Sequence, residues 1–245
     1  MIDIKKAELA FKEYLKDYNV NDEKVALKIR HTYGVVKASE YLAGAIGLDE
    51  DDTNLSRLIA LLHDIGRFEQ WKLYKTYNDK NSVDHGELSK DILDELDCNE
   101  LFYIDSEKAY ILKESIRYHT KEYDGNDKVL EKYIKIIKNA DAYSNVFSTA
   151  SGMQQIFVSE EGYNKELLDD FTKQKKLHKY SYKSKLDRSL MLAACLYYVE
   201  YDFLRKEIVS ANYFESIYES FSKYLNAKEK IIYRTALYDL KKSYI

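Results

Sequence analysis

The chain has 245 residues, a formal net charge of −4 and 45% hydrophobic residues. That length allows one large domain or two small ones, with enough apolar residues for a sizeable core. The negative charge argues against nonspecific binding of nucleic-acid polymers, because such proteins are usually basic. Two cysteines are too few for a disulfide framework, so we expect a cytoplasmic protein. No apolar stretch approaches the roughly 20 residues that span a bilayer, and the first residues do not form a signal peptide, so we expect no membrane association.

Helical periodicity runs through almost the whole chain, and no alternating run of apolar and polar residues is long enough to predict a strand. Proline is absent and only eight glycines occur, so few positions break helices. We therefore expect an all-α protein. The pattern predicts helices at about 4–18, 22–46, 52–65, 87–97, 106–120, 129–149, 163–178, 184–206, 210–225 and 227–243.

The longest stretch without a helical pattern is 67–86. Loops of this length in compact domains are usually functional or disordered. This stretch contains Trp71, Tyr74, Tyr77 and His85, so we expect an ordered wall of an active site. Simple packing of the aromatic rings within the loop is the alternative.

The part of the chain after residue 160 contains no set of metal-ligand residues. Its helical patterns are amphipathic; within 184–206, for example, Leu190, Ala194, Tyr197 and Tyr201 recur at helical spacing. We expect a core at 1–160 and a helical extension at 161–245, packed together as one continuous domain. The extension either covers the site or forms an oligomer surface, and in the second case the protein would be a homodimer.

Four of the five histidines form an ordered series with two aspartates, and both residue types are ligands that transition metals prefer. The series is His31, His63-Asp64, His85, His119 and Asp141. Asp64 interrupts an apolar run, where an ionised carboxylate costs several kcal/mol unless a cation or donors neutralise it. We therefore predict a metal site. The fifth histidine, His178, lies among lysines and is expected on the solvated surface.

The order His31, His63-Asp64, Asp141, with Ile65-Gly66 after a buried helix, resembles the HD-domain superfamily of metal-dependent phosphohydrolases over roughly residues 25–150. The resemblance implies an HD-type helical bundle, here with a C-terminal helical extension. It also implies that these four residues ligate a metal ion.

His85 and His119 bear on the number of ions. Superfamily members with two ions place two further histidines between the His-Asp pair and the last aspartate, and this chain does the same. The resemblance therefore implies two ions per chain, with both histidines as ligands. The alternative is a single ion, with the two histidines binding phosphate or donating protons.

Each predicted ligand also has a purely structural alternative. His31 shares a helix face with Val35 and Leu42 and would then be a satisfied core histidine. His63 and Asp64 diverge by about 100° on a helix, so both reach one ion only near a helix end. Without a metal they would form a helix C-terminus with an exposed carboxylate. Asp141 would then cap a helix or pair with Arg30 or Lys138.

The catalytic residues we predict are Asp64, which would bridge two ions, and Arg67, whose guanidinium would bind phosphate oxygens in pairs. A surface ion pair of Arg67 with Glu69 is the alternative. The predicted substrate contacts are Arg67, Trp71, Lys72, Tyr77 and Asn145. Lys75, Asn78, Asp79 and Asp84 are weaker candidates in the same loop.

Mixed imidazole and carboxylate ligation favours Mn, Fe, Co, Ni or Zn. Such an ion makes hydroxide available at neutral pH, which predicts hydrolysis of a phosphoester or phosphoanhydride without a covalent nucleophile. The resemblance favours a nucleotide, since most known substrates of the superfamily are nucleotides. The segments Arg30–Val35 and Arg117–Thr120 are similar to dinucleoside-tetraphosphate hydrolases within it. The alternatives are a di-iron HD-domain oxygenase and a metal-stabilised nucleotide-binding module without turnover.

Overall fold

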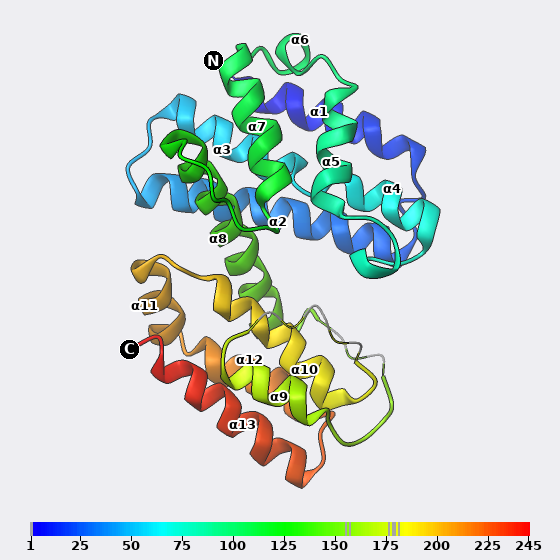
Figure 1. The fold of residues 1–245 in the computed structure, drawn as a ribbon, viewed down its shortest axis with the longest axis vertical. Coiled ribbons are helices and arrows are strands. Elements are labelled where there is room, and N and C mark those ends of the chain that lie inside the picture. Colours follow the sequence, from blue (N-terminus) through cyan, green and yellow to red (C-terminus); the bar gives the residue numbers. More distant parts are fainter. Residues whose placement is uncertain (1, 155, 157, 176, 178–179, 181) are drawn as a thin grey trace. The chain divides into compact units, whose positions relative to one another are not determined.

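The computed structural model describes residues 2–154, 156, 158–175, 177, 180 and 182–245 (Figure 1). These residues form helices and no strand beyond an isolated bridge between Glu160 and Ser184. The expected all-α class is confirmed. The elements are α1 (Ile4–Tyr14), η1 (Leu15–Asp17), α2 (Glu23–Ala45), α3 (Glu50–Leu62), α4 (Ile65–Tyr74), η2 (Asp79–Asn81), α5 (His85–Asp94), α6 (Cys98–Phe102), α7 (Ser106–Tyr118), α8 (Lys128–Ala150), α9 (Lys165–Thr172), α10 (Lys185–Ala193), η3 (Ala194–Tyr198), α11 (Asp202–Ser210), α12 (Tyr213–Ser222) and α13 (Ala227–Lys242).

Side-chain caps mark the helix starts in a chain that has no proline. Asp22 accepts a hydrogen bond from the backbone N–H of Lys24 at the start of α2, and Asp49 and Asp84 cap α3 and α5 in the same way. Each cap satisfies a backbone donor that has no partner within its own helix. The aspartates therefore determine where these helices begin.

The chain divides into two compact units, Met1–Asp141 and Ala142–Ile245, and the division falls within α8. The core at 1–160 and the extension at 161–245 stay predictions. None of the described helices combines the length and the low polarity that crossing a bilayer requires.

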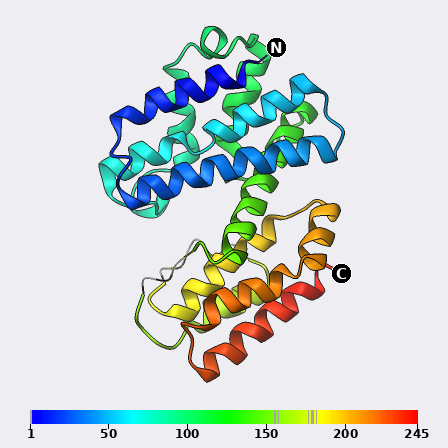
Figure 2. The same cartoon turned by 180° about the vertical axis from the view of Figure 1, so that it is seen from behind.

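In the first unit the long helices α2 and α3 run side by side, as both views show (Figures 1 and 2). Leu42 of α2 and Leu55 and Leu58 of α3 are buried here. α1 packs on the same core through Phe11, whose ring meets Phe68 of α4 edge-on, with 5.9 Å between centroids. This core leaves the C-terminal end of α3 buried, at His63.

The prediction of a loop at 67–86 is wrong for residues 67–74, which belong to α4. Phe68 and Gln70 are fully buried there. The buried Gln70 amide donates to Asp79, Ser82 and the carbonyl of Val83, which fastens the following segment to the helix. The buried face of this short helix includes a polar residue whose partners lie outside the helix, so apolar periodicity does not reveal the helix in the sequence.

Two glycines allow the helices around the site to approach closely. A Cβ on Gly66 would lie 2.7 Å from the backbone nitrogen of Ser89, and one on Gly86 would lie 2.9 Å from the carbonyl of Arg117. α4 therefore lies directly against α5, and α5 against α7. In this way the two glycines bring His85 toward both Asp64 and His119.

The second unit contains α9 to α13 and η3; α9 and α10 pack on α13, α11 packs on α12 and α12 on α13, and Tyr233 of α13 is fully buried. The single helix predicted at 184–206 is wrong, because the chain leaves helical geometry at Val199. The carbonyl of Val199 accepts a hydrogen bond from Arg205 Nε at 2.8 Å instead of from a helical N–H. The aromatic and β-branched residues at 197–199 also favour helix weakly. His178 lies outside the described residues.

Candidate metal centre

Asp64 lies at the centre of the candidate site, at the turn between α3 and α4. The helix α3 ends at Leu62, and Asp64 has non-helical φ −108° and ψ 19° before α4 begins. This turn lets His63 and Asp64 point into the same space, as two neighbours within a helix would not. The Asp64 side chain is 3% exposed.

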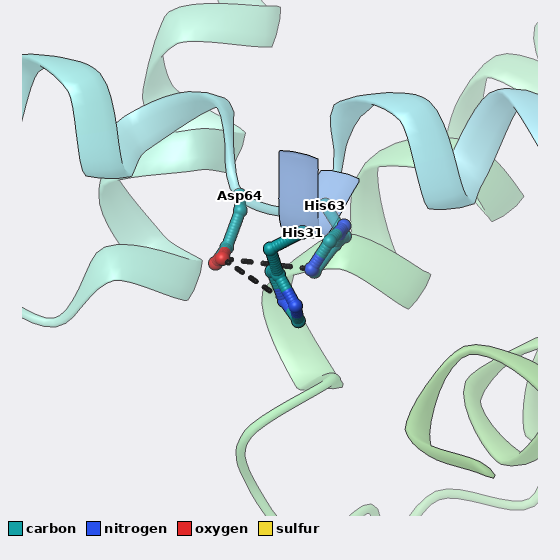
Figure 3. Close-up of side chains that lie close together, drawn as sticks. All are labelled: His31, His63 and Asp64. Atoms are coloured by element: carbon teal, nitrogen blue, oxygen red, sulfur yellow. Dashed lines mark ion pairs between the residues drawn. The ribbon is translucent and has the colours of Figure 1, made fainter. Parts of the chain in front are cut away.

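One oxygen of Asp64 faces the first pair of histidines. Oδ2 lies 3.7 Å from His31 Nε2 and 3.6 Å from His63 Nε2 (Figure 3). His31 Nε2 also lies 3.0 Å from Oδ1 of Asp141, at the end of the first unit's part of α8. Asp64, His31 and His63 each offer an atom to a common point that would suit a metal ion.

The other oxygen of Asp64 faces the second pair. Oδ1 lies 3.5 Å from His85 Nε2 and 3.8 Å from His119 Nε2, while the two imidazole nitrogens lie 3.2 Å apart. These three residues form a second group that would suit a metal ion. The carboxylate of Asp64 is thus shared between two sets of donors.

Hydrogen bonds at the far side of three rings identify their tautomers. His63 Nδ1 donates to the carbonyl of Ala60 and His119 Nδ1 to that of Ile116, and His85 Nδ1 donates to the Asp79 carboxylate. Carbonyl and carboxylate oxygens only accept, so each Nδ1 carries the proton and each neutral ring presents a lone pair at Nε2.

Whether these residues fit a metal ion depends on whether the Nε2 lone pairs have other partners. His63 Nε2 is buried and makes no hydrogen bond to any described residue. The Nε2 lone pairs of His85 and His119 face each other, which is repulsive unless a cation lies between or beside them. Outer hydrogen bonds of this kind also orient metal-binding histidines in general. The donor set therefore fits divalent transition metals.

Burial keeps these imidazoles neutral and the carboxylates charged. It lowers the pKa of His85 and of His119 to about 4, and at His85 the positive charge of Arg67 adds to the effect. Burial also lowers the pKa of His63. It would raise the pKa of Asp64, but the ammonium of Lys28 and the guanidinium of Arg67 hold that pKa well below its ordinary value. Neutral imidazoles and an ionised carboxylate are the forms that bind metal.

Arg67 is anchored at one end and free at the other. Its Nη1 donates to Gln70, to the carbonyl of Tyr77 and to Asp79, each at 2.7 Å. Its Nε lies 3.7 Å from Asp64 Oδ1, is buried and has no hydrogen-bond partner among the described residues. The alternative pair with Glu69 is wrong. The guanidinium instead turns its Nε edge, which makes no hydrogen bond, toward Asp64.

The remaining predicted substrate contacts are placed differently. Tyr77 lies beside the site, with its ring centroid 5.8 Å from Arg67 Cζ and 5.2 Å from the Trp71 ring. Trp71 donates to Asp22 from its indole nitrogen. Lys72 is 52% exposed and pairs with Glu69. Asn145 belongs to the second unit, so its role stays a prediction.

Sequence reasoning missed Lys28 and ranked Asp79 low. Lys28 Nζ lies 2.6 Å from Asp64 Oδ2, and Asp79 contacts both His85 and Arg67. A signal for Lys28 was present, since it precedes His31 by three residues and so shares its helix face. Nothing in the local pattern distinguishes Asp79 from the other polar residues around it.

A family model of the HD domain matches residues 29–146. The chain is an HD-domain protein. HD domains bind divalent metals, and the superfamily is one of metal-dependent phosphohydrolases, although some HD proteins are not hydrolases. The family and the fold that the sequence predicted are therefore confirmed. Searches of curated proteins and of solved structures found no match.

Proposed function

We propose that this HD-domain protein is a metal-dependent phosphohydrolase that cleaves a phosphoester or phosphoanhydride of a small molecule, with a nucleotide as the favoured substrate. The observation that carries the proposal is the shared carboxylate of Asp64. Its two oxygens face two histidine pairs, and at least three of these rings present unprotonated nitrogens. Such an arrangement is costly without bound cations.

Two ions per chain are part of the proposal. His31, His63, Asp64 and Asp141 would hold one ion, and Asp64, His85 and His119 would hold the other. Mn, Fe, Co, Ni and Zn all suit these ligands. Held by these residues, a divalent ion would supply hydroxide near neutral pH.

The chain's own residues would bind and orient the phosphoryl group. Arg67 is held by three hydrogen bonds at Nη1, so its Nε, which makes no hydrogen bond, is fixed next to Asp64. A guanidinium edge binds two phosphoryl oxygens at once and offsets the charge that develops on them. No serine, cysteine or lysine is needed as a nucleophile.

A nucleotide is supported by the superfamily and by aromatic rings near the site. The Tyr77 ring lies next to Arg67 and packs against Trp71. A base that stacks on this pair would place its phosphate toward the guanidinium. Trp71, Lys72, Tyr77 and Asn145 remain proposed substrate contacts.

The test is metal analysis of the purified protein together with a phosphate-release screen over nucleotides and simple phosphoesters with added Mn²⁺. We expect about two metal ions per chain and turnover that depends on metal. R67A should lower kcat/KM by about 10²–10³-fold, as for loss of a transition-state donor. The matched control is R234A, because Arg234 is 59% exposed and pairs with Glu215 in the second unit.

Other outcomes favour the alternatives. One metal ion per chain together with turnover would indicate that His85 and His119 bind phosphate or donate protons rather than ligate a second ion. Bound iron with oxygen consumption and no phosphate release would indicate the oxygenase. Tight binding of metal and nucleotide without product would indicate a binding module, and absence of metal binding would contradict the site.

A further inference from the structure

Lys28 occupies an oxygen that the candidate metal site requires. Its ammonium lies 2.6 Å from Asp64 Oδ2 and its side chain is 18% exposed. The same oxygen faces His31 Nε2 at 3.7 Å and His63 Nε2 at 3.6 Å. A divalent ion bound by these three residues would therefore share one carboxylate oxygen with an ammonium, and the two cations would repel each other.

The position of Lys28 also suits a second task. Lys28 and Arg67 lie at opposite oxygens of Asp64, since Arg67 Nε is 3.7 Å from Oδ1. Both cations lie beside the same ring, with Lys28 Nζ 5.5 Å and Arg67 Cζ 5.8 Å from the centroid of Tyr77. The flexible four-carbon stem of a lysine lets its ammonium move away from Asp64 without any backbone change.

We propose that a metal ion at the His31 and His63 side displaces Lys28 from Asp64, and that the freed ammonium binds the substrate phosphoryl group opposite Arg67. Lys28 is then a substrate-binding residue that is available only in the metal-loaded protein. The inference rests on the proposed function for its substrate, but its metal-dependent step does not require turnover.

The first test measures metal affinity by calorimetry with Mn²⁺ alone. Metal binding to the wild type must break the charge-assisted hydrogen bond between Lys28 and Asp64, so K28M should bind Mn²⁺ about tenfold more tightly. K28R keeps the competing cation and should bind as the wild type does. K37M is the matched control, because Lys37 is exposed on the same helix. Unchanged or weaker Mn²⁺ binding by K28M would overturn the displacement.

The second test measures binding of inorganic phosphate to the Mn²⁺-loaded protein. K28M should bind phosphate about tenfold more weakly than the wild type, and K28R and K37M should not. Phosphate affinity that is unchanged in K28M would overturn the substrate-binding role. If both binding results hold but no phosphoester is hydrolysed, the proposed function fails while the role of Lys28 stands.

A third measurement needs no variant and so does not depend on the folding of K28M. At fixed pH, acylation of wild-type Lys28 by a water-soluble amine reagent should be several-fold faster with Mn²⁺ than without it. Lys37 serves as the internal reference and should react at the same rate in both states. Equal modification of Lys28 with and without metal would contradict the displacement.

Discussion

Both units of the chain bury carboxylates, but they satisfy them differently. In the second unit, Asp187 accepts the backbone N–H of Asn164 at 2.8 Å, and Glu229 accepts those of Gly162 and Asn226 at 2.7 and 3.0 Å. In the first unit, Asp64 has a single short hydrogen bond, from Lys28, and otherwise faces imidazole nitrogens.

The difference separates structural from functional burial. A buried acid that accepts backbone N–H groups already has the donors it needs, and it holds loops and helix starts in place. A buried acid that faces unprotonated imidazole nitrogens is surrounded by other acceptors, so only a cation can satisfy the group as a whole. The groups around a buried acid, rather than the acid itself, therefore distinguish a structural contact in the second unit from a candidate binding site in the first.

The largest expected effect is on catalysis, in a comparison of two single variants that each remove one buried aspartate, Asp64 of the first unit or Asp187 of the second. D64A should lower kcat/KM by about 10³-fold or more, because both proposed metal sites would lose their common ligand. D187A should leave kcat/KM per folded molecule unchanged but lower the free energy of unfolding by about 1–3 kcal/mol, since the Asn164 N–H loses its acceptor. Phosphate release and urea unfolding measure the two effects. Loss of turnover in folded D187A would break the comparison.

Metal should stabilise the first unit in particular. An ion that binds only the folded state contributes about 4 kcal/mol at a concentration a thousand times its Kd. Hydrogen exchange should show this gain in α2, α3, α5 and α7, which carry or support the ligands, and a chelator should reverse it. Equal protection of α10 and α13 would contradict a metal site confined to the first unit.

Acid should destabilise the metal-free first unit. The pKa of His85 and of His119 is about 4 in the folded protein, against an ordinary value of 6.5. As pH falls below 6.5 the unfolded chain takes up protons that the folded imidazoles refuse, so stability falls and the full loss is reached near pH 4. The loss is on the order of 3 kcal/mol for each ring. Hydrogen exchange at pH 7 and 4.5 measures it. The described part of the second unit contains no histidine, so α10 and α13 should change little.

The sequence predicted the helical class and the ordered histidines and aspartates because both are periodic or compositional signals. Apolar spacing marks long helices such as α2 and α8, and the structure brings the four histidines and Asp64 together. Where the predictions were wrong, the decisive contacts are tertiary. Gln70 is polar in the sequence yet fully buried, because its amide nitrogen finds hydrogen-bond acceptors in Asp79, Ser82 and the carbonyl of Val83.

Lys28 and Asp79 were difficult to predict for a related reason. Each is an ordinary charged residue in its own segment, and its partner lies elsewhere in the chain. Lys28 reaches Asp64 from another helix, and Asp79 reaches His85 and Arg67 from η2. Sequence patterns identify ligands by residue type, whereas the residues that hold the ligands depend on packing.

The smallest effect, and the sharpest test of the comparison, comes from D79N. Asp79 is half-buried, and it resembles the acids of the second unit in that protein groups donate to it, here the side chains of His85, Arg67 and Gln70. These donors hold its pKa below the ordinary value although partial burial would raise it. One of those partners is a proposed metal ligand, however. D79N should therefore weaken Mn²⁺ binding by about 10–100-fold, as for other residues that orient a ligand.

The matched control for D79N is D94N, since Asp94 lies on α5 with His85 but pairs with Lys90. Calorimetry should show D94N binding Mn²⁺ as the wild type does. If D79N lost only stability, an acid whose partners are all protein groups would be structural wherever it lies. If D79N loses metal affinity, an acid contributes to metal binding when one of its partners is itself a ligand. Asp79 would then serve both the fold and the metal site.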